Sequence, residues 1–502
     1  MNSPPDARSI ALPGNPFLEA LEPYLSTNDL EIRLQNWPLA GLDIPNLSIT
    51  ARHDLLDLLT EQMFEPTLTS IDTTTRLYRM IRRGYIARDP TQVTSRAHLM
   101  SIARYAGKEL KDLPWFPHSA KCMRVSGVTG LGKTYELLRA LKQLPQTFKH
   151  GHSSSADWNH MTQISWLYVA MSHDGSLGGL LLQILVEIDA CAGTRYASDR
   201  GITKLSNEKL AVHVGIILNN HAVGVLVFDE LQGRNFAGGN RGGLAATFFL
   251  RLLNFGIPLV LMGNPKGLDA LDRFSQDMRR VGSAGNIEMH PMTKDEFDYT
   301  DVLAPALWRY NVMPEPCEVD DNDGAILFHY CGGIRAYGAR IRAASQRLAL
   351  DQDDRKVTED HMRQAFMGPD FSSRDRQLIA GFRDQTPLLL MNFDDVPWER
   401  YAQRWGVYPE DAPAKAADKP SADSPAAEET TKKGRKPVAQ QAAQSAARRR
   451  TRAKNEEASN AQVVADLETD DMRNQGLQEY LITGIGLLQN QDKPGAPLAK
   501  GI

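Results

Sequence analysis

The residues best suited to bind phosphate form one short run, G-V-T-G-L-G-K-T, at positions 127–134. Its spacing is G-x-x-x-x-G-K-[ST], in which glycines let successive backbone N–H groups turn inward around an anion. Lys133 would reach the β- and γ-phosphates of a nucleotide, and the Thr134 hydroxyl would ligate Mg²⁺. The run therefore predicts a site for ATP and Mg²⁺. Its members are Gly127, Val128, Thr129, Gly130, Leu131, Gly132, Lys133 and Thr134.

Polar residues end two later strand-like runs. The apolar run at 223–228 is followed by Asp229 and Glu230. Asp229 is predicted to hold Mg²⁺ through water, and Glu230 to orient and polarise the attacking water. The next run, at 256–263, ends before Asn264, whose amide could contact the γ-phosphate or that water. An acidic pair or a Gly-Asn-Pro turn is common in isolation, so this interpretation depends on their order behind the phosphate loop.

Arginines could complete such a site in two ways. Arg279 and Arg280 follow the helix expected after the third strand, and one of them would reach the γ-phosphate of a neighbouring subunit as an arginine finger. The alternative is a solvated basic pair. Arg335 follows a Gly-Gly break at the start of a helix, where it would sense the nucleotide of its own chain, with Arg340 and Arg342 as competitors. An arginine finger acts only between subunits, so a ring or filament is expected.

These side chains require an α/β framework. An apolar run precedes the phosphate loop, a helical pattern follows it, and strand-like runs then alternate with helices, which favours a mostly parallel sheet. The order of the motifs is that of an AAA+ ATPase, so the expected core is a parallel five-stranded sheet flanked by helices. The expected regions are an N-terminal accessory region (1–117), the ATPase core (118–295), a helical lid (296–370) and a C-terminal helical extension (371–408).

Composition narrows the class of protein. The formal net charge of the 502 residues is −4, so any nucleic-acid binding must come from local basic patches. The four cysteines show no C-x-x-C spacing, which disfavours a disulfide framework or a zinc site and favours a reducing compartment. The N-terminus has no signal-peptide pattern, and no apolar run approaches the roughly 20 residues of a membrane span. A cytoplasmic protein without a membrane partner is expected.

Several blocks of the sequence resemble TnsC, the AAA+ regulator of bacterial Tn-seven-like transposons, which has TniB as a relative. The blocks MIRRGYIARDP (80–90) and SHDGSLGGLLLQIL (172–185) are far more specific than the phosphate loop. The remaining blocks occur in the order of that family. They are NPFLEAL (15–21), DELQ (229–232), PLVLMGNPKG (258–267) and DMRRVGSAG (277–285).

The resemblance implies a role as well as an activity. Such proteins oligomerise with ATP on target duplex DNA, link a target-site selector of the TnsD or TniQ type to the transposase TnsA/TnsB, and regulate its activation by ATP hydrolysis. Residues 1–117 are then expected to meet the target protein, and DNA to be held through its phosphates, tolerantly of sequence. Candidate contacts in surface loops are Lys149, His152 and Ser176. Ordinary surface loops are the alternative.

The composition changes after about residue 408. Residues 409–460 are rich in Ala, Pro and charge, with few large apolar residues, which predicts a disordered linker. Residues 431–455 carry nine basic residues and no acidic one, so they could hold DNA non-specifically or merely be solvated. Residues 461–502 regain apolar content and are expected to dock on the transposase, at a TnsA-type subunit.

Two other interpretations remain open. Another AAA+ DNA machine, such as a helicase loader or an origin-recognition ATPase, would share the phosphate loop but would usually carry a recognisable winged helix, and no clear one is evident. A STAND-type signalling switch would normally carry a long repeat array, and the sequence shows no fixed-period repeat.

Overall fold

The computed structural model describes residues 14–23, 25–113, 120–171, 175–231, 239–272, 280–315 and 321–407. The chain divides into two units, residues 1–414 and residues 415–502, and all described residues lie in the first. Arg279, the linker expected at 409–460 and the tail expected at 461–502 lie outside the described residues.

A parallel five-stranded sheet forms the core, in the order β4-β5-β6-β1-β7. Since the carboxyl ends of parallel strands meet at one edge, the residues that follow β1, β5 and β6 are brought together there. The predicted sheet is thereby confirmed. Its strands are β1 (Cys122–Gly127), β4 (Leu167–Ala170), β5 (Leu226–Leu231), β6 (Leu259–Gly263) and β7 (Gly285–Met289).

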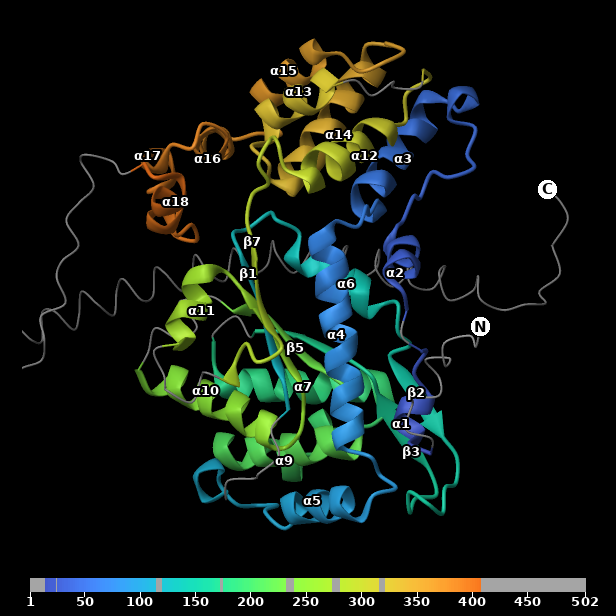
Figure 1. Cartoon of the computed structure of the whole chain (residues 1–502), viewed down its shortest axis with the longest axis vertical. Helices are drawn as coiled ribbons and strands as arrows, with labels where there is room; N and C mark the ends of the chain where they lie inside the picture. The colour runs from blue at the N-terminus through green and yellow to red at the C-terminus, as the bar shows by residue number, and fades with distance from the viewer. Residues whose placement is uncertain are drawn as a thin grey trace, which may run out of the picture. The chain divides into compact units, whose positions relative to one another are not determined.

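Helices cover both faces of the sheet. Successive side chains of a strand point to opposite faces, and Phe228 packs in the core with α7, α9 and α10 while Val227 packs with α4 and α6. Both are fully buried, as is typical of strands in a parallel sheet. Figure 1 shows α4 as one long helix along its face. The bounds are α4 (Leu68–Ala87), α6 (Lys133–Leu141), α7 (Leu177–Ala192), α9 (Asn207–Asn220) and α10 (Gly239–Asn254).

The predicted lid is a group of helices with a core of its own. Leu56 and Leu59, which come from the N-terminal part of the chain, are buried in that core. The N-terminal region is therefore shared between two cores, because α3 packs with the lid and α4 with the sheet. The helices are α3 (Ile49–Gln62), α12 (Ala304–Arg309), α13 (Asp321–Cys331), α14 (Arg335–Asp351) and α15 (Glu359–Met367).

The C-terminal extension packs on the phosphate loop. Val128 and Leu131 of the loop are buried in one cluster with Phe382 and Phe393 of the extension. The extension consists of α16 (Ser373–Arg383), α17 (Pro387–Leu390) and α18 (Trp398–Trp405). The remaining described α-helices and strands are α1 (Pro16–Glu19), α2 (Thr27–Leu34), α5 (Val93–Ala103), α8 (Arg200–Thr203), α11 (Pro265–Asp272) and the hairpin strands β2 (Thr147–His150) and β3 (Met161–Ile164).

The described helices include none with the length and apolar character that a bilayer crossing needs. Cys122, Cys191 and Cys331 carry free thiols, and Cys317 lies outside the described residues.

Candidate nucleotide-binding site

The predicted phosphate loop is the turn between β1 and α6. Gly130 and Gly132 have φ values of 90° and 88°, a region that only glycine adopts without strain. Gly132 is the N-cap of α6 and supplies no side-chain hydrogen bond, so no capping side chain competes for the first N–H groups of the helix. The Lys133 ammonium donates to the carbonyl oxygens of Gly127 (2.9 Å) and Val128 (3.0 Å). The loop therefore has the form of an anion nest at a helix N-terminus.

Asp229 lies beside this loop at the end of β5. The Thr134 hydroxyl donates to Asp229 Oδ2 over 2.7 Å, and the Tyr168 hydroxyl on β4 donates to the same oxygen over 2.5 Å. Only 2% of Asp229 is exposed. A hydroxyl and a carboxylate held together in this way are oxygen ligands of the kind that Mg²⁺ prefers, so the pair fits the predicted metal site.

Glu230 and Asn264 occupy the same edge of the sheet. Glu230 has a φ of 58°, and the pairing of β5 with β6 shifts register between Phe228 and Leu231. A positive φ is uncommon for a residue other than glycine and marks a locally constrained backbone. Asn264 caps α11, where its amide oxygen accepts from Gly267 N over 2.7 Å. Both residues line the cavity described next.

A cavity of about 420 Å³ joins these groups. This volume lies within the range typical of small-molecule and cofactor sites. Polar groups from the phosphate loop, β5 and β6 line one part of it, and apolar side chains of the N-terminal region and the lid line another. Its lining includes Met63, Thr129, Gly130, Gly132, Lys133, Thr134, Asp229, Glu230, Asn264, Leu303, Leu307, Arg335 and Ala336.

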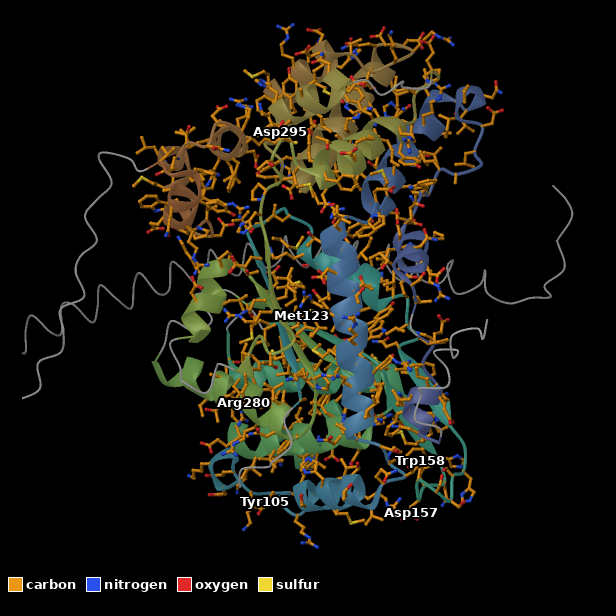
Figure 2. All side chains as sticks on the ribbon, viewed as in Figure 1. Tyr105, Met123, Asp157, Trp158, Arg280 and Asp295 are labelled. Carbon is orange, nitrogen blue, oxygen red and sulfur yellow. The ribbon has the colours of Figure 1, made fainter. Side chains whose placement is uncertain are left out.

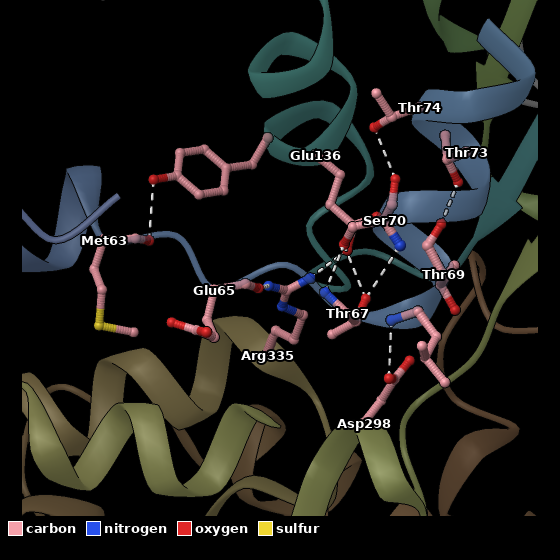
Figure 3. A network of polar contacts seen from close by, with 12 residues as sticks. Met63, Glu65, Thr67, Thr69, Ser70, Thr73, Thr74, Glu136, Asp298 and Arg335 are labelled. Carbon is pink, nitrogen blue, oxygen red and sulfur yellow. Dashed lines mark hydrogen bonds and ion pairs between the residues drawn. The ribbon is translucent and has the colours of Figure 1, made fainter. Parts of the chain in front are cut away.

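Arg335 connects the lid to the phosphate-loop helix. Its guanidinium forms an ion pair with Glu136 on α6 and donates to the carbonyl oxygen of Glu65 over 3.2 Å (Figure 3). Both side chains are largely buried, with 13% of Arg335 and 4% of Glu136 exposed. Burial raises the pKa of Glu136, and the positive charge of Arg335 opposes that rise. Glu136 is a partner that the sequence did not indicate.

The structure separates Arg335 from its two competitors. Arg340 forms a 3.8 Å ion pair with Asp375, and Arg342 is buried over the Trp308 ring at 4.1 Å. Of the three arginines, Arg335 is the one that lines the cavity. Its role as a nucleotide sensor stays a prediction.

Arg280 lies elsewhere in the ATPase core. Its guanidinium donates to the side-chain oxygen of Asn254 at the end of α10 over 3.0 Å, and it is absent from the described lining of the cavity (Figure 2). Arg279 lies outside the described residues. The arginine-finger role of either residue stays a prediction.

Asp395 in the extension is a second neighbour of the phosphate loop that the sequence did not indicate. The Thr129 hydroxyl donates to Asp395 Oδ2 over 2.8 Å. Burial lowers the pKa of Lys133, while the negative charges of Asp229, Glu230 and Asp395 oppose this effect. No motif surrounds Asp395, so only the fold brings its carboxylate to the loop.

The three residues predicted to touch DNA fall in two places. Lys149 lies exposed on β2 and His152 follows it, because the segment expected as a loop forms an antiparallel hairpin with β3. Figure 2 marks Asp157 and Trp158 in the connection of this hairpin. Ser176 lies on a different element, where its hydroxyl accepts from Gly179 N over 3.0 Å and caps α7. Contact with DNA stays a prediction for all three.

Residues 118–271 match a family model described as an AAA domain. The chain has the AAA+ ATPase fold. The phosphate loop and the acidic strand β5 both lie within the matched residues. No curated protein matches the chain.

Several solved structures are similar to the chain. The ORC2 protein of Aeropyrum pernix in its ADPNP–ADP complexes has 12% identity and a TM-score of 0.34, covering 63% of this chain and 85% of its own. The A. pernix ORC1 protein in complex with DNA has 16% identity and a TM-score of 0.33, covering 61% and 76%. The Thermotoga maritima RuvB Holliday junction branch migration motor has 11% identity and a TM-score of 0.31, covering 62% and 80%. At these identities and TM-scores, the similarity supports no conclusion about activity or partners.

Proposed function

We propose that the AAA domain binds ATP with Mg²⁺ in the 420 Å³ cavity, which we call the nucleotide cavity, and hydrolyses the ATP. The observation that carries the proposal is the meeting of Lys133, the Thr134–Asp229 pair and Glu230 in one cavity. Bound ATP and Mg²⁺ would supply the phosphoryl group and the metal charge. Lys133 would hold the phosphates and Glu230 would orient the attacking water, with Asn264 beside it. Arg335 would contact the nucleotide from the lid.

The chain would work as an oligomer on duplex DNA. Arg279 and Arg280 would serve the nucleotide of a neighbouring subunit, which agrees with the absence of Arg280 from the described lining of its own cavity. The exposed hairpin with Lys149 and His152 offers cationic and polar groups to DNA phosphates. Binding would then be tolerant of sequence and sensitive to salt.

The finer proposal is a regulator of transposition in the bacterial cytoplasm. Its support is the resemblance to TnsC in the blocks 80–90 and 172–185. In this role the chain would link a selector of the TnsD or TniQ type to the transposase TnsA/TnsB, and ATP hydrolysis would regulate activation of the transposase.

Electron micrographs with duplex DNA and a non-hydrolysable ATP analogue test the assembly. Rings or filaments on DNA are expected with the analogue and not with ADP. Lys133→Ala should remove them, while Lys142→Ala, which removes an exposed charge on the same segment, should not. Assembly by Lys133→Ala without nucleotide would contradict the proposal.

An insertion assay tests the finer role. In cells that carry a matching transposase and target selector, Lys133→Ala should abolish insertion. Unchanged insertion would contradict the transposition role and would not affect the ATPase proposal. Another AAA+ DNA machine would then be the alternative.

A further inference from the structure

A second cavity, of about 210 Å³, lies at the amino end of β1. Four segments that are distant in sequence line it: the end of α4, the start of α5, the residues before β1 and the turn at Gly256 before β6. The end of α4 belongs to the MIRRGYIARDP block, to which the proposed function gives no task. We call this space the Arg88 cavity. Ligands of α/β proteins usually bind at the opposite, carboxyl edge of the sheet, where the nucleotide cavity lies.

Arg88 is the central residue of this cavity. Its side chain is buried, with 5% of the residue exposed, and Nη2 donates to the carbonyl oxygen of Val223 over 2.7 Å. Nε donates to the carbonyl oxygen of Gly84 over 3.2 Å. The third guanidinium nitrogen, Nη1, is buried and has no hydrogen-bond partner in the described part of the chain. Arg88 lines the cavity, but Nη1 is too deeply buried for a molecule in the cavity to touch it. Arg88 therefore gives the cavity positive charge rather than an open donor group.

The charge of Arg88 is not balanced nearby. Burial lowers the pKa of Arg88 to about 10, so the guanidinium is still protonated at neutral pH. The opposing influence comes from Tyr85 and not from a carboxylate. A buried charge without a counter-ion is costly, because it has lost its hydration and gained no opposite charge. An anion in the cavity would reduce that cost.

The other polar groups around the cavity suit an oxyanion. Arg83 and Lys121 add two exposed cations, and Thr94 and Ser95 add hydroxyl groups. Among the described residues that line the cavity, none is Asp or Glu. A water molecule in the cavity would not balance the charge of Arg88, whereas an anion would. The two exposed cations and the Thr94 hydroxyl match the several acceptor oxygens of a phosphate, while the Ser95 hydroxyl donates to the carbonyl oxygen of Ala87 over 3.3 Å.

We propose that the Arg88 cavity binds a phosphate group. Arg83 and Lys121 would bind it directly from the surface, while the positive charge of Arg88 attracts it from the wall of the cavity. The phosphate would come either from the free anion or from the backbone of duplex DNA. The proposal is independent of the function assigned to the nucleotide cavity.

The test uses the full chain with saturating ADP and Mg²⁺, so that the phosphate loop is already filled. The melting temperature is followed as inorganic phosphate replaces chloride at constant ionic strength. The pocket variant is Arg83→Gln with Lys121→Gln, and its matched control is Arg79→Gln with Lys108→Gln, which removes two exposed charges outside the described lining. Wild type and control should show a saturable rise in melting temperature. The phosphate affinity of the pocket variant should be about tenfold lower.

A duplex-DNA arm identifies the source of the phosphate. If DNA supplies it, the pocket variant should bind duplex DNA several-fold more weakly than the control, and inorganic phosphate should compete. If the free anion is the ligand, the two variants should bind DNA equally. Both results keep the phosphate site and assign its source.

Two results would overturn the proposal: no stabilisation of wild type by phosphate, or equal stabilisation of the pocket variant and its control. Arg88→Gln is measured beside them and should also lower phosphate affinity, because it removes the buried positive charge. Arg88 also donates to the carbonyl oxygen of Val223, so its substitution removes a contact of the fold. The test therefore depends on the variant at the exposed residues Arg83 and Lys121.

Discussion

The two cavities at the ends of β1 differ in whether acidic side chains lie close to their cations. In the nucleotide cavity Lys133 has Asp229, Glu230 and Asp395 around it, and Arg335 is paired with Glu136. In the Arg88 cavity the buried guanidinium donates to two carbonyl oxygens and lies 5.5 Å from the centre of the Tyr85 ring. The six residues of β1 separate the two, a span of about 20 Å in an extended strand. The cations of the nucleotide cavity are balanced by acidic side chains of the chain itself, whereas none of the described residues that line the Arg88 cavity is Asp or Glu.

Lys133→Ala should have the largest effect, and it should affect the nucleotide cavity alone. Removing the ammonium leaves the loop without the cation that would hold the phosphates, so ATP affinity should fall by more than about 100-fold and hydrolysis should be lost. Calorimetric titration with ATP and Mg²⁺ measures the affinity. The response of the Arg88 cavity to phosphate should be unchanged, and its loss would show that the two cavities are not independent.

Glu230→Gln should separate binding from chemistry in the nucleotide cavity. The amide cannot polarise water as a carboxylate does, so the rate of hydrolysis should fall about 1,000-fold while ATP affinity stays within about threefold. Steady-state phosphate release and ATP titration measure the two quantities. Glu31→Gln on the exposed surface of α2 is the control. Retained hydrolysis would assign the water to another residue.

Arg335→Ala should leave Glu136 as a buried charge without a counter-ion, like Arg88 in the other cavity. The free energy of unfolding should fall by about 3 kcal/mol, since one member of a buried pair is left alone. Arg347→Ala, which removes a half-exposed arginine from the same helix, should cost less than about 1 kcal/mol. Urea denaturation measures both.

Two further results sharpen that test. Adding Glu136→Gln to Arg335→Ala should recover part of the stability. The loss should also shrink as the pH falls, because a carboxyl whose pKa is raised in the folded state takes up its proton there first, and proton uptake then favours folding. A loss that is independent of pH would show that the effect is not that of a buried charge.

Asp395→Asn should have the smallest effect and the opposite sign. Its carboxylate accepts from Thr129 in the loop that would hold the phosphates, so removing the negative charge should raise ATP affinity about threefold. Asp394→Asn is the control, since it makes the same change at the exposed neighbouring residue. A fall in affinity would instead assign Asp395 a supporting role in the loop.

The nucleotide cavity could be predicted because its chemistry lies in contiguous motifs. The phosphate loop occupies one run of residues, and Asp229 and Asn264 come directly after buried strands. In a parallel sheet such strand ends share an edge, so the order of motifs along the chain was enough to bring them together. The helix that starts at Arg335 could be predicted for the same reason, from a Gly-Gly break before a periodic pattern.

Contacts between distant segments could not be predicted in this way. Asp395 is 266 residues from Thr129, and Glu136 is 199 residues from Arg335. The Arg88 cavity is assembled from four separate segments, and a buried arginine has no sequence signature when its partners are backbone carbonyl oxygens. Such sites depend on how the helices dock on the sheet and lid, which local patterns do not determine.

The central proposal is that the chain hydrolyses ATP in the cavity at the carboxyl end of β1 while it is assembled on duplex DNA. The most direct measurement is the rate of ATP hydrolysis by the purified chain with and without duplex DNA. We expect a rate of ATP hydrolysis that depends on Mg²⁺, rises with duplex DNA and falls to background in Lys133→Ala. Hydrolysis that persists in Lys133→Ala, or that duplex DNA leaves unchanged, would contradict it.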